Sequence, residues 1–245
     1  MGNGMGRLAK IGRAAVASLG ASCAGGGGGG PPAPSGPSYD LAAGIASLSA
    51  TPVDSAMDIS GTSDGYDLTG TARLTQTVAT ATTFGGGAAL LQTTTVSGTG
   101  VDALGSQISF LYSFAQYGSS AHAVLGVDTN YNSVLEYAVA KSPIEFPTSV
   151  RVGDAGFLGK MTLFFDGDRS TDIIEVSYAV IGDPNRSDAV IVEVIEQYDD
   201  NGADGQTNQF DYALTAAGTM FLQSLAVSYP PSNVSAASTL VFTVR

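Results

Sequence analysis

Hydrophobic and polar residues alternate along most of the chain after residue 40. In the segment 107–114 (QISFLYSF), every second residue is a large hydrophobic or aromatic one. The same period of two recurs at 172–180 (DIIEVSYAV) and at 208–215 (NQFDYALT). Side chains two positions apart point to the same side of a β-strand, so these segments are predicted to be half-buried strands.

About eleven strands are predicted in this way, separated by turns rich in Gly, Asp and Asn. They are expected at 66–80, 88–99, 106–117, 120–128, 133–141, 158–166, 171–182, 188–199, 207–214, 219–229 and 237–244. The short gaps leave no room for crossover helices, which favours antiparallel pairing. We therefore expect an all-β fold, either an antiparallel β-sandwich or a strongly curved sheet. The segment 40–60 tolerates a short helix best.

Residues 141–156 (KSPIEFPTSVRVGDAG) interrupt the alternation with two prolines. They separate about five predicted strands from about six. The body, 40–245, is accordingly expected to be one domain or two tightly packed lobes, with a candidate seam at 141–156.

Charge is distributed unevenly along the chain. The full sequence has 10 basic and 22 acidic residues, a net charge of −12. Three of the basic residues, Arg7, Lys10 and Arg13, precede the first acid, Asp40, so loss of residues 1–22 would leave 10 − 3 = 7 basic residues against 22 acids, or −15. Nucleic-acid binding normally depends on Lys and Arg contacts to phosphate, so we expect no nucleic-acid partner.

The chain has no run of about 18 apolar residues, so no transmembrane helix is expected. Strands that span a membrane need apolar rows facing lipid. Many of the predicted strands are rich in Thr and Ser on both faces, which makes a spanning sheet the less favoured alternative.

The first 22 residues have the order of a secretory signal: a basic segment and then a short apolar one, AAVASLGAS. Ala21 and Ser22 end this segment, Cys23 follows it, and six glycines begin at Gly25. This arrangement resembles the lipobox of bacterial lipoproteins. The resemblance implies that Cys23 receives a diacylglycerol, that the leader 1–22 is removed, and that the new N-terminus is acylated.

Residues 23–39 are expected to be a tether between the lipid and the body. Gly-rich chain behaves as a random coil, and the prolines that follow favour an extended chain. In lipoproteins an Asp directly after the Cys retains the protein at the inner membrane; Ala24 stands there, which implies the outer membrane. Cleavage after Ala24, which would release a secreted protein, is an alternative, as is a cytoplasmic protein with a basic tail.

The latter half of the body resembles uncharacterised β-rich lipoproteins of proteobacteria. The resemblance rests on the order VRVGDAGFLG, IIEVSYAV, AVIVEVIEQYDDNG, FDYALTAAG and LVFTV. It covers about 100 residues by strand and turn order, and it implies no activity.

No catalytic residue is predicted. His122 is the single histidine, and pairing with Ser119 or Ser120 lacks both a Gly-x-Ser-x-Gly elbow and an orienting carboxylate. Cys23 precedes a flexible glycine run in which no base is held beside the thiol. With one His and one Cys, the chain also lacks the ligands of a zinc site.

Calcium is the one metal that the sequence leaves open. Asp199, Asp200, Asn201 and Asp204 crowd the segment 198–211 (YDDNGADGQTNQFD), but its spacing fails as an EF-hand loop. Asn-Gly and Asp-Gly are also typical of β-hairpin turns, which is the favoured interpretation. The same holds for a second acidic segment, which contains Asp166, Asp168 and Asp172.

The sequence thus predicts a lipid-anchored bacterial envelope protein with a non-catalytic binding, adhesive or structural role. Its expected partners are the membrane, through the anchor, and an envelope or surface protein. No cofactor is predicted. The alternatives are a carboxylate-based hydrolase, secreted or anchored, and a calcium-stabilised adhesive module.

Overall fold

A computed structural model describes residues 36–131, 134–165, 168–200, 203–231 and 236–245. One helix and fifteen strands are assigned in these residues. They are β1 (Tyr39–Asp40), α1 (Leu41–Ala50), β2 (Val53–Ser63), β3 (Tyr66–Gln76), β4 (Thr80–Phe84), β5 (Gly87–Asp102), β6 (Gln107–Gly118), β7 (Val124–Tyr131), β8 (Val134–Ile144), β9 (Ser149–Val150), β10 (Ala155–Phe165), β11 (Asp168–Gly182), β12 (Ala189–Asp200), β13 (Ala203–Thr215), β14 (Met220–Tyr229) and β15 (Ser238–Val244).

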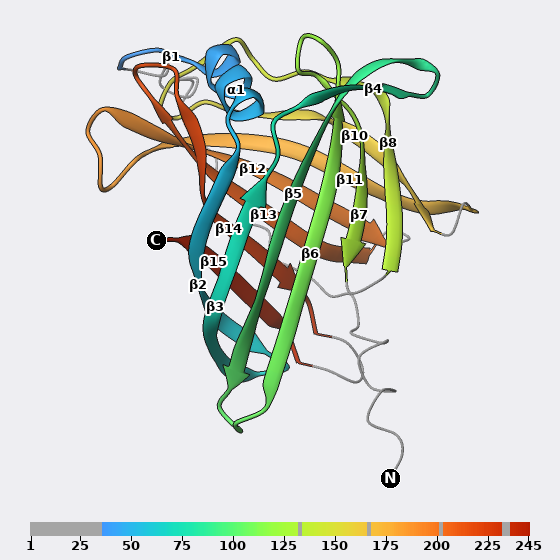
Figure 1. The fold of residues 1–245 in the computed structure, drawn as a ribbon, viewed down its shortest axis with the longest axis vertical. Helices are drawn as coiled ribbons and strands as arrows, with labels where there is room; N and C mark the ends of the chain where they lie inside the picture. The colour runs from blue at the N-terminus through green and yellow to red at the C-terminus, as the bar shows by residue number, and fades with distance from the viewer. Residues whose placement is uncertain (1–35, 132–133, 166–167, 201–202, 232–235) are drawn as a thin grey trace, which may run out of the picture.

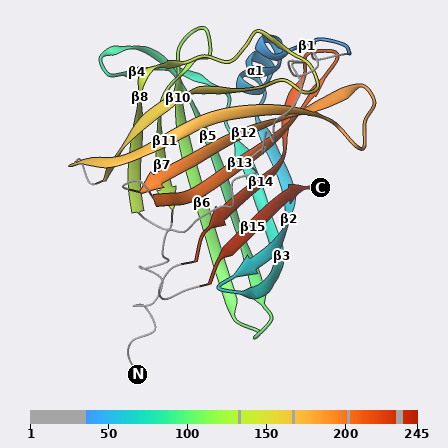
Figure 2. The same cartoon turned by 180° about the vertical axis from the view of Figure 1, so that it is seen from behind.

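Thirteen of the strands form one antiparallel sheet in the order β3-β2-β15-β14-β13-β12-β11-β10-β8-β7-β6-β5-β4. The sheet closes on itself, because β3 also pairs with β5, from Leu68 opposite Asp102 to Gln76 opposite Thr94. β4 pairs with the remaining length of the same edge of β5, from Thr80 opposite Leu91 to Phe84 opposite Gly87. The result is a ring of strands around a common interior (Figures 1 and 2).

Glycines permit the close approach of β3 and β5 where the ring closes. A Cβ atom at Gly70 would lie 2.2 Å from the carbonyl oxygen of Thr99, and one at Gly98 would lie 2.4 Å from that of Thr71. Both distances are far below van der Waals contact. The seam therefore depends on residues without side chains at these two positions.

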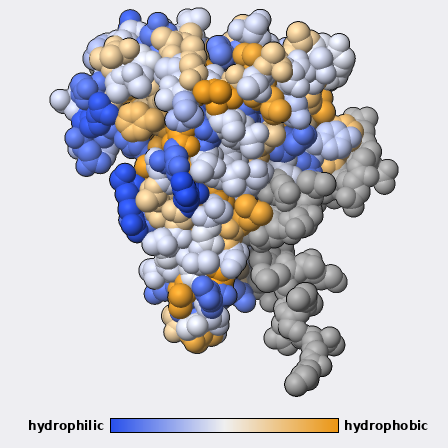
Figure 3. Space-filling model, viewed as in Figure 1, coloured by the Kyte–Doolittle hydropathy of each residue, from blue (hydrophilic) through white to orange (hydrophobic). Residues whose placement is uncertain are grey.

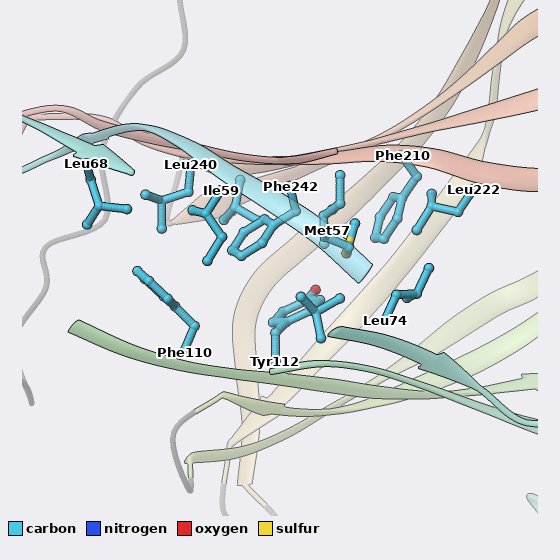
Figure 4. Close-up of a cluster of buried hydrophobic side chains, with 13 residues drawn as sticks. Met57, Ile59, Leu68, Leu74, Phe110, Tyr112, Phe210, Leu222, Leu240 and Phe242 are labelled. Atoms are coloured by element: carbon cyan, nitrogen blue, oxygen red, sulfur yellow. The ribbon is translucent and has the colours of Figure 1, made fainter. Parts of the chain in front are cut away.

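The interior of the narrower part of the ring is a hydrophobic core. Its buried members come from β2, β3, β5, β6, β13, β14 and β15. Ile59 of β2 and Leu240 and Phe242 of β15 face Phe110 and Tyr112 of β6 across the interior (Figure 4). They are Met57, Ile59, Leu68, Leu74, Val96, Phe110, Tyr112, Phe210, Leu222, Leu225, Val227, Leu240 and Phe242. Burial of one large apolar side chain contributes about 1.5–3 kcal/mol, so this cluster is a main source of stability.

The face of the molecule shown in Figure 3 mixes hydrophilic residues, residues of intermediate hydropathy and scattered hydrophobic ones. Ion pairs join Arg73 to Asp54 and Lys160 to Glu175 between neighbouring strands. Their side chains are about half exposed, and exposed pairs contribute little to stability. No helix among the residues that the structure describes is long and apolar enough to cross a membrane.

Helix α1 covers one end of the ring, opposite the end that carries the β5–β6 hairpin (Figure 1). Asp40 caps the helix, its Oδ1 accepting a hydrogen bond from the backbone N–H of Ala43 at 2.9 Å. At the other end, the carbonyl of Leu48 accepts hydrogen bonds from the side-chain amides of Gln76 and Gln92, both at 3.0 Å. These bonds attach the helix to β3 and β5.

The prediction of an all-β antiparallel fold is confirmed, and of its two forms the strongly curved sheet is the one observed. Each of the eleven predicted segments contains a strand. Residues 141–156 do not divide the sheet, because β8 and β10 on either side of them pair directly, from Ala140 opposite Met161 to Glu136 opposite Phe165.

The alternation of hydrophobic and polar residues did not predict β2. The expected helix in 40–60 ends at Ala50, and residues 53–63 form a central strand between β3 and β15. The inward-facing residues of β2 include Val53, Met57 and Ile59, but Ser55 and Gly61 interrupt this hydrophobic pattern. Small residues weaken the local signal, while pairing on both edges supplies the stability of this strand.

Candidate functional site

An internal cavity lies between helix α1 and the core of the ring. It is lined by Ile45, Leu48, Phe114, Gln116, Val124, Val127, Ile144, Phe146, Met161, Val176, Val194, Glu196, Phe210, Tyr212 and Met220. About 80 Å³ of it is open to the centres of water-sized molecules, which is room for several of them.

The alternating pattern of the strands explains why the lining is apolar. Phe114 of β6 and Phe210 of β13 point inward and meet edge to face, with ring centroids 5.5 Å apart. Val194 of β12 packs against all three clusters of the core, so it lies near the middle of the interior. Ile45 and Leu48 belong to α1, so the helix supplies part of the cavity wall.

Three polar side chains also line this apolar cavity: Glu196 of β12, Tyr212 of β13 and Gln116 of β6. Glu196 retains some exposed surface, which faces the cavity, but it is otherwise enclosed by protein. Burial raises the pKa of its carboxyl to about 7, and a hydrogen bond from Asn208 opposes part of that rise. Burial and then the charge of Glu196 raise the pKa of Tyr212.

Asn208 is the centre of a polar network below the cavity. It is fully buried, at 0% exposure. Its Nδ2 lies within hydrogen-bond distance of three oxygens: the hydroxyl of Tyr112 at 3.1 Å, Oε2 of Glu196 at 3.2 Å and the hydroxyl of Tyr198 at 3.3 Å. Its Oδ1 accepts a bond of 2.7 Å from Nε2 of Gln206. The network holds Glu196 in place from one side.

A smaller pocket lies on the far side of Tyr198. Its lining contains three carboxyl groups, those of Glu136, Asp172 and Asp199, together with Gln206 of the network. About 40 Å³ is open to the centres of water-sized molecules. Within the described residues, no group of three or more His, Cys, Asp or Glu side chains is placed to hold a metal ion.

The residues proposed for calcium fall in the β12–β13 hairpin. Asp199 and Asp204 are opposite one another in the backbone register, as the hairpin interpretation expects. Asn201 lies outside the described residues, and so does Asp166 of the other acidic segment. The calcium-stabilised alternative stays a prediction. Thermal melting of the protein with and without EDTA would test it.

Among the described residues, the imidazole of His122 makes no hydrogen bond to Ser119 or Ser120, and only its backbone N–H donates to the carbonyl of Ser119, at 2.9 Å. Oγ of Ser119 accepts hydrogen bonds from the backbone N–H groups of Ala121 and Ala123, at 3.2 and 3.1 Å. Nδ1 of His122 instead lies 3.4 Å from Oγ of Ser49, at the end of α1. Cys23, the predicted lipid attachment site, lies outside the described residues.

Sequence reasoning missed Glu196, Asn208 and Tyr212 as a group. A signal was present, because Glu196 continues the inward row that begins with Val192 and Val194. A charged residue in an otherwise apolar inward row is unusual and points to a special environment. That Asn208 lies beside it is a consequence of the β12–β13 register, in which the two residues are directly opposite.

The cavity has the chemistry of a binding site. A carboxyl, a phenol and an amide are able to hydrogen-bond a ligand, and the apolar walls bury its remaining atoms. Glycoside hydrolysis uses two carboxyl groups that flank the substrate. Glu196 is the one acid among the described residues that line this cavity.

Comparison with known proteins gives no family assignment. No family model matches the chain. No curated protein matches it either. Among solved structures, the chain is similar to a porin-like protein from Bacteroides uniformis, with 10% sequence identity over 78% of this chain and 98% of that one. The TM-score is 0.24, so this similarity supports no inference about fold or function.

Proposed function

We propose that this protein is a non-catalytic binding protein that holds a small, mainly apolar molecule in the cavity beneath α1. The observation that carries the proposal is the cavity itself, which lies inside the ring and is lined largely by hydrophobic and aromatic side chains. Interiors of proteins are normally close-packed, and binding sites are the usual exception.

The proposal includes attachment of the body to the bacterial outer membrane through lipid on Cys23. The lipobox-like residues and the glycine run support it. Two or more acyl chains anchor a protein stably, since each buried methylene contributes about 0.8 kcal/mol. The tether 23–39 would keep the ring close to the envelope, where it binds its ligand or presents it to a partner protein.

Ligand binding is tested with benzyl alcohol as the probe, followed by NMR shifts of the methyl groups of Ile45 and Leu48. We expect saturable shifts in the wild type. Val194→Phe fills the middle of the cavity and should weaken binding at least tenfold. Val101→Phe makes the same change where the side chain is 49% exposed, and it should leave binding unchanged.

Circular dichroism and the dispersion of the NMR spectrum establish that both variants fold, because overpacking a core costs about 1–3 kcal/mol. Equal binding by wild type and Val194→Phe, or no binding to the wild type, would contradict the proposed site.

Anchoring is tested separately in a bacterial host. The intact mass of the protein from the membrane fraction should equal residues 23–245 plus acyl chains. Cys23→Ser should remove the lipid and release the protein from membranes. A mass that begins at Gly25 with no lipid would instead establish the secreted alternative.

A further inference from the structure

Three polar side chains in the cavity have donor or acceptor atoms that make no hydrogen bond to the described residues. Asn208 donates to Oε2 of Glu196, and Oε1 receives no hydrogen bond from any described residue. The hydroxyl of Tyr212 and the amide of Gln116 make no hydrogen bond to the described part of the chain either. Polar groups inside a protein normally have partners, so a ligand with a polar head is expected here.

The electrostatic environment of these groups is negative. Glu196 lines the cavity, and Glu136 lines the neighbouring pocket. After burial, the negative charges of Glu196 and Glu136 both contribute to raising the pKa of Tyr112 and of Tyr198. No Lys or Arg is found among the described residues that line either space. A cationic head group would supply a counter-charge to Glu196.

We propose that the cavity binds a small amphipathic amine, whose ammonium group is held by Glu196, Tyr212 and Gln116 and whose apolar body packs against Phe114, Val194 and Phe210. This inference rests on the proposed function and specifies its ligand class. A primary ammonium has three N–H donors and no acceptor. The free oxygens of the carboxylate, the phenol and the amide are three acceptors that suit it.

Energetics favour an amine over an alcohol of the same shape. A buried carboxylate without a counter-charge is unfavourable, whereas a charge-assisted hydrogen bond to an ammonium is about twice as strong as a neutral one. The space fits a body of limited size, because about 80 Å³ corresponds to roughly six water-sized spheres. Benzylamine and benzyl alcohol are therefore suitable probes, since they share a phenyl ring and differ in the head group.

The experiment compares the two probes near pH 8, where the Glu196 carboxyl is mostly ionised. We expect the wild type to bind benzylamine at least tenfold more tightly than benzyl alcohol. Glu196→Gln should abolish this preference while retaining the binding of benzyl alcohol. Glu175→Gln removes the same charge from the outer face of β11, so it should keep the preference.

The outcomes separate the two proposals. Equal affinities for the two probes in the wild type, or a preference that persists in Glu196→Gln, would overturn the amine proposal and leave the cavity as a site for neutral apolar molecules. Failure of both probes to bind would overturn the proposed function as well. Loss of the preference in Glu175→Gln would mean that overall charge, not Glu196, selects the amine.

Discussion

The buried carboxyl of Glu196 should make the stability of this protein depend on pH in a direction opposite to that of most acidic residues. Replacement by Gln keeps the size of the side chain and an oxygen that accepts the hydrogen bond from Asn208. It removes the charge. The difference between Glu196→Gln and the wild type therefore reports the cost of the charged carboxylate in the interior.

The magnitude follows from the pKa of Glu196, which burial raises from 4.5 to about 7. The difference is 7 − 4.5 = 2.5 pKa units. Each unit corresponds to about 1.4 kcal/mol, so ionisation inside the folded protein costs about 3–4 kcal/mol relative to the unfolded chain. Between these two pH values the folded state binds more protons at Glu196 than the unfolded state. Its contribution to the free energy of unfolding is therefore greatest below about pH 4.5 and is lost as the pH rises through about 7.

The assay is urea unfolding of ligand-free protein at several values between about pH 4.5 and pH 8. Wild type and Glu196→Gln should be similarly stable at the acid end. The variant should become more stable than the wild type by up to about 3–4 kcal/mol near pH 8. Glu175→Gln, a change in an exposed ion pair, should show no such rise. A constant difference across this range, or a variant that is less stable near pH 8, would refute the reasoning.

Two further variants test the framework of the ring. Gly70→Ala places a Cβ atom 2.2 Å from a backbone oxygen of β5, so thermal melting should show a free energy of unfolding lower by at least about 2 kcal/mol. Gly182→Ala has open space around its Cβ position, so it should lower the free energy of unfolding by less than about 1 kcal/mol. Equal effects of these two variants would argue against the closed seam. Asn208→Ala removes the donor shared by Tyr112, Tyr198 and Glu196, and the loss of these buried hydrogen bonds should lower the free energy of unfolding by about 2–4 kcal/mol. A loss below about 1 kcal/mol in urea unfolding would mean that the network does not hold these groups.

Much of the fold could be predicted from the sequence, because alternation is a local property of a strand. The predicted segment 106–117 and the observed β6, Gln107–Gly118, differ by one residue at each end. Both faces of this strand were also identified, since Phe110 and Phe114 pack inside the ring. Turns rich in Gly and Asp marked where such strands end.

The candidate site was predicted much less well. Glu196 was visible as an acid in an apolar row, but its importance depends on Asn208 of the next strand and Tyr112 of a strand far away in sequence. The roof of the cavity depends on α1, which the bonds from Gln76 and Gln92 hold in place. No pattern in the sequence around these residues predicts any of these contacts.

By itself, the sequence determined most of the strands, their inward and outward faces, and the acidic character of the body. These properties follow from side chains one or two positions apart and from a count of charges. The tertiary structure alone decided that the sheet closes, because the pairing of β3 with β5 and of β2 with β15 joins separate segments of the chain. Because the sheet closes, the inward-facing side chains of its strands share one interior. Helix α1 covers one end of that interior, and residues of the helix and of several strands together line the cavity.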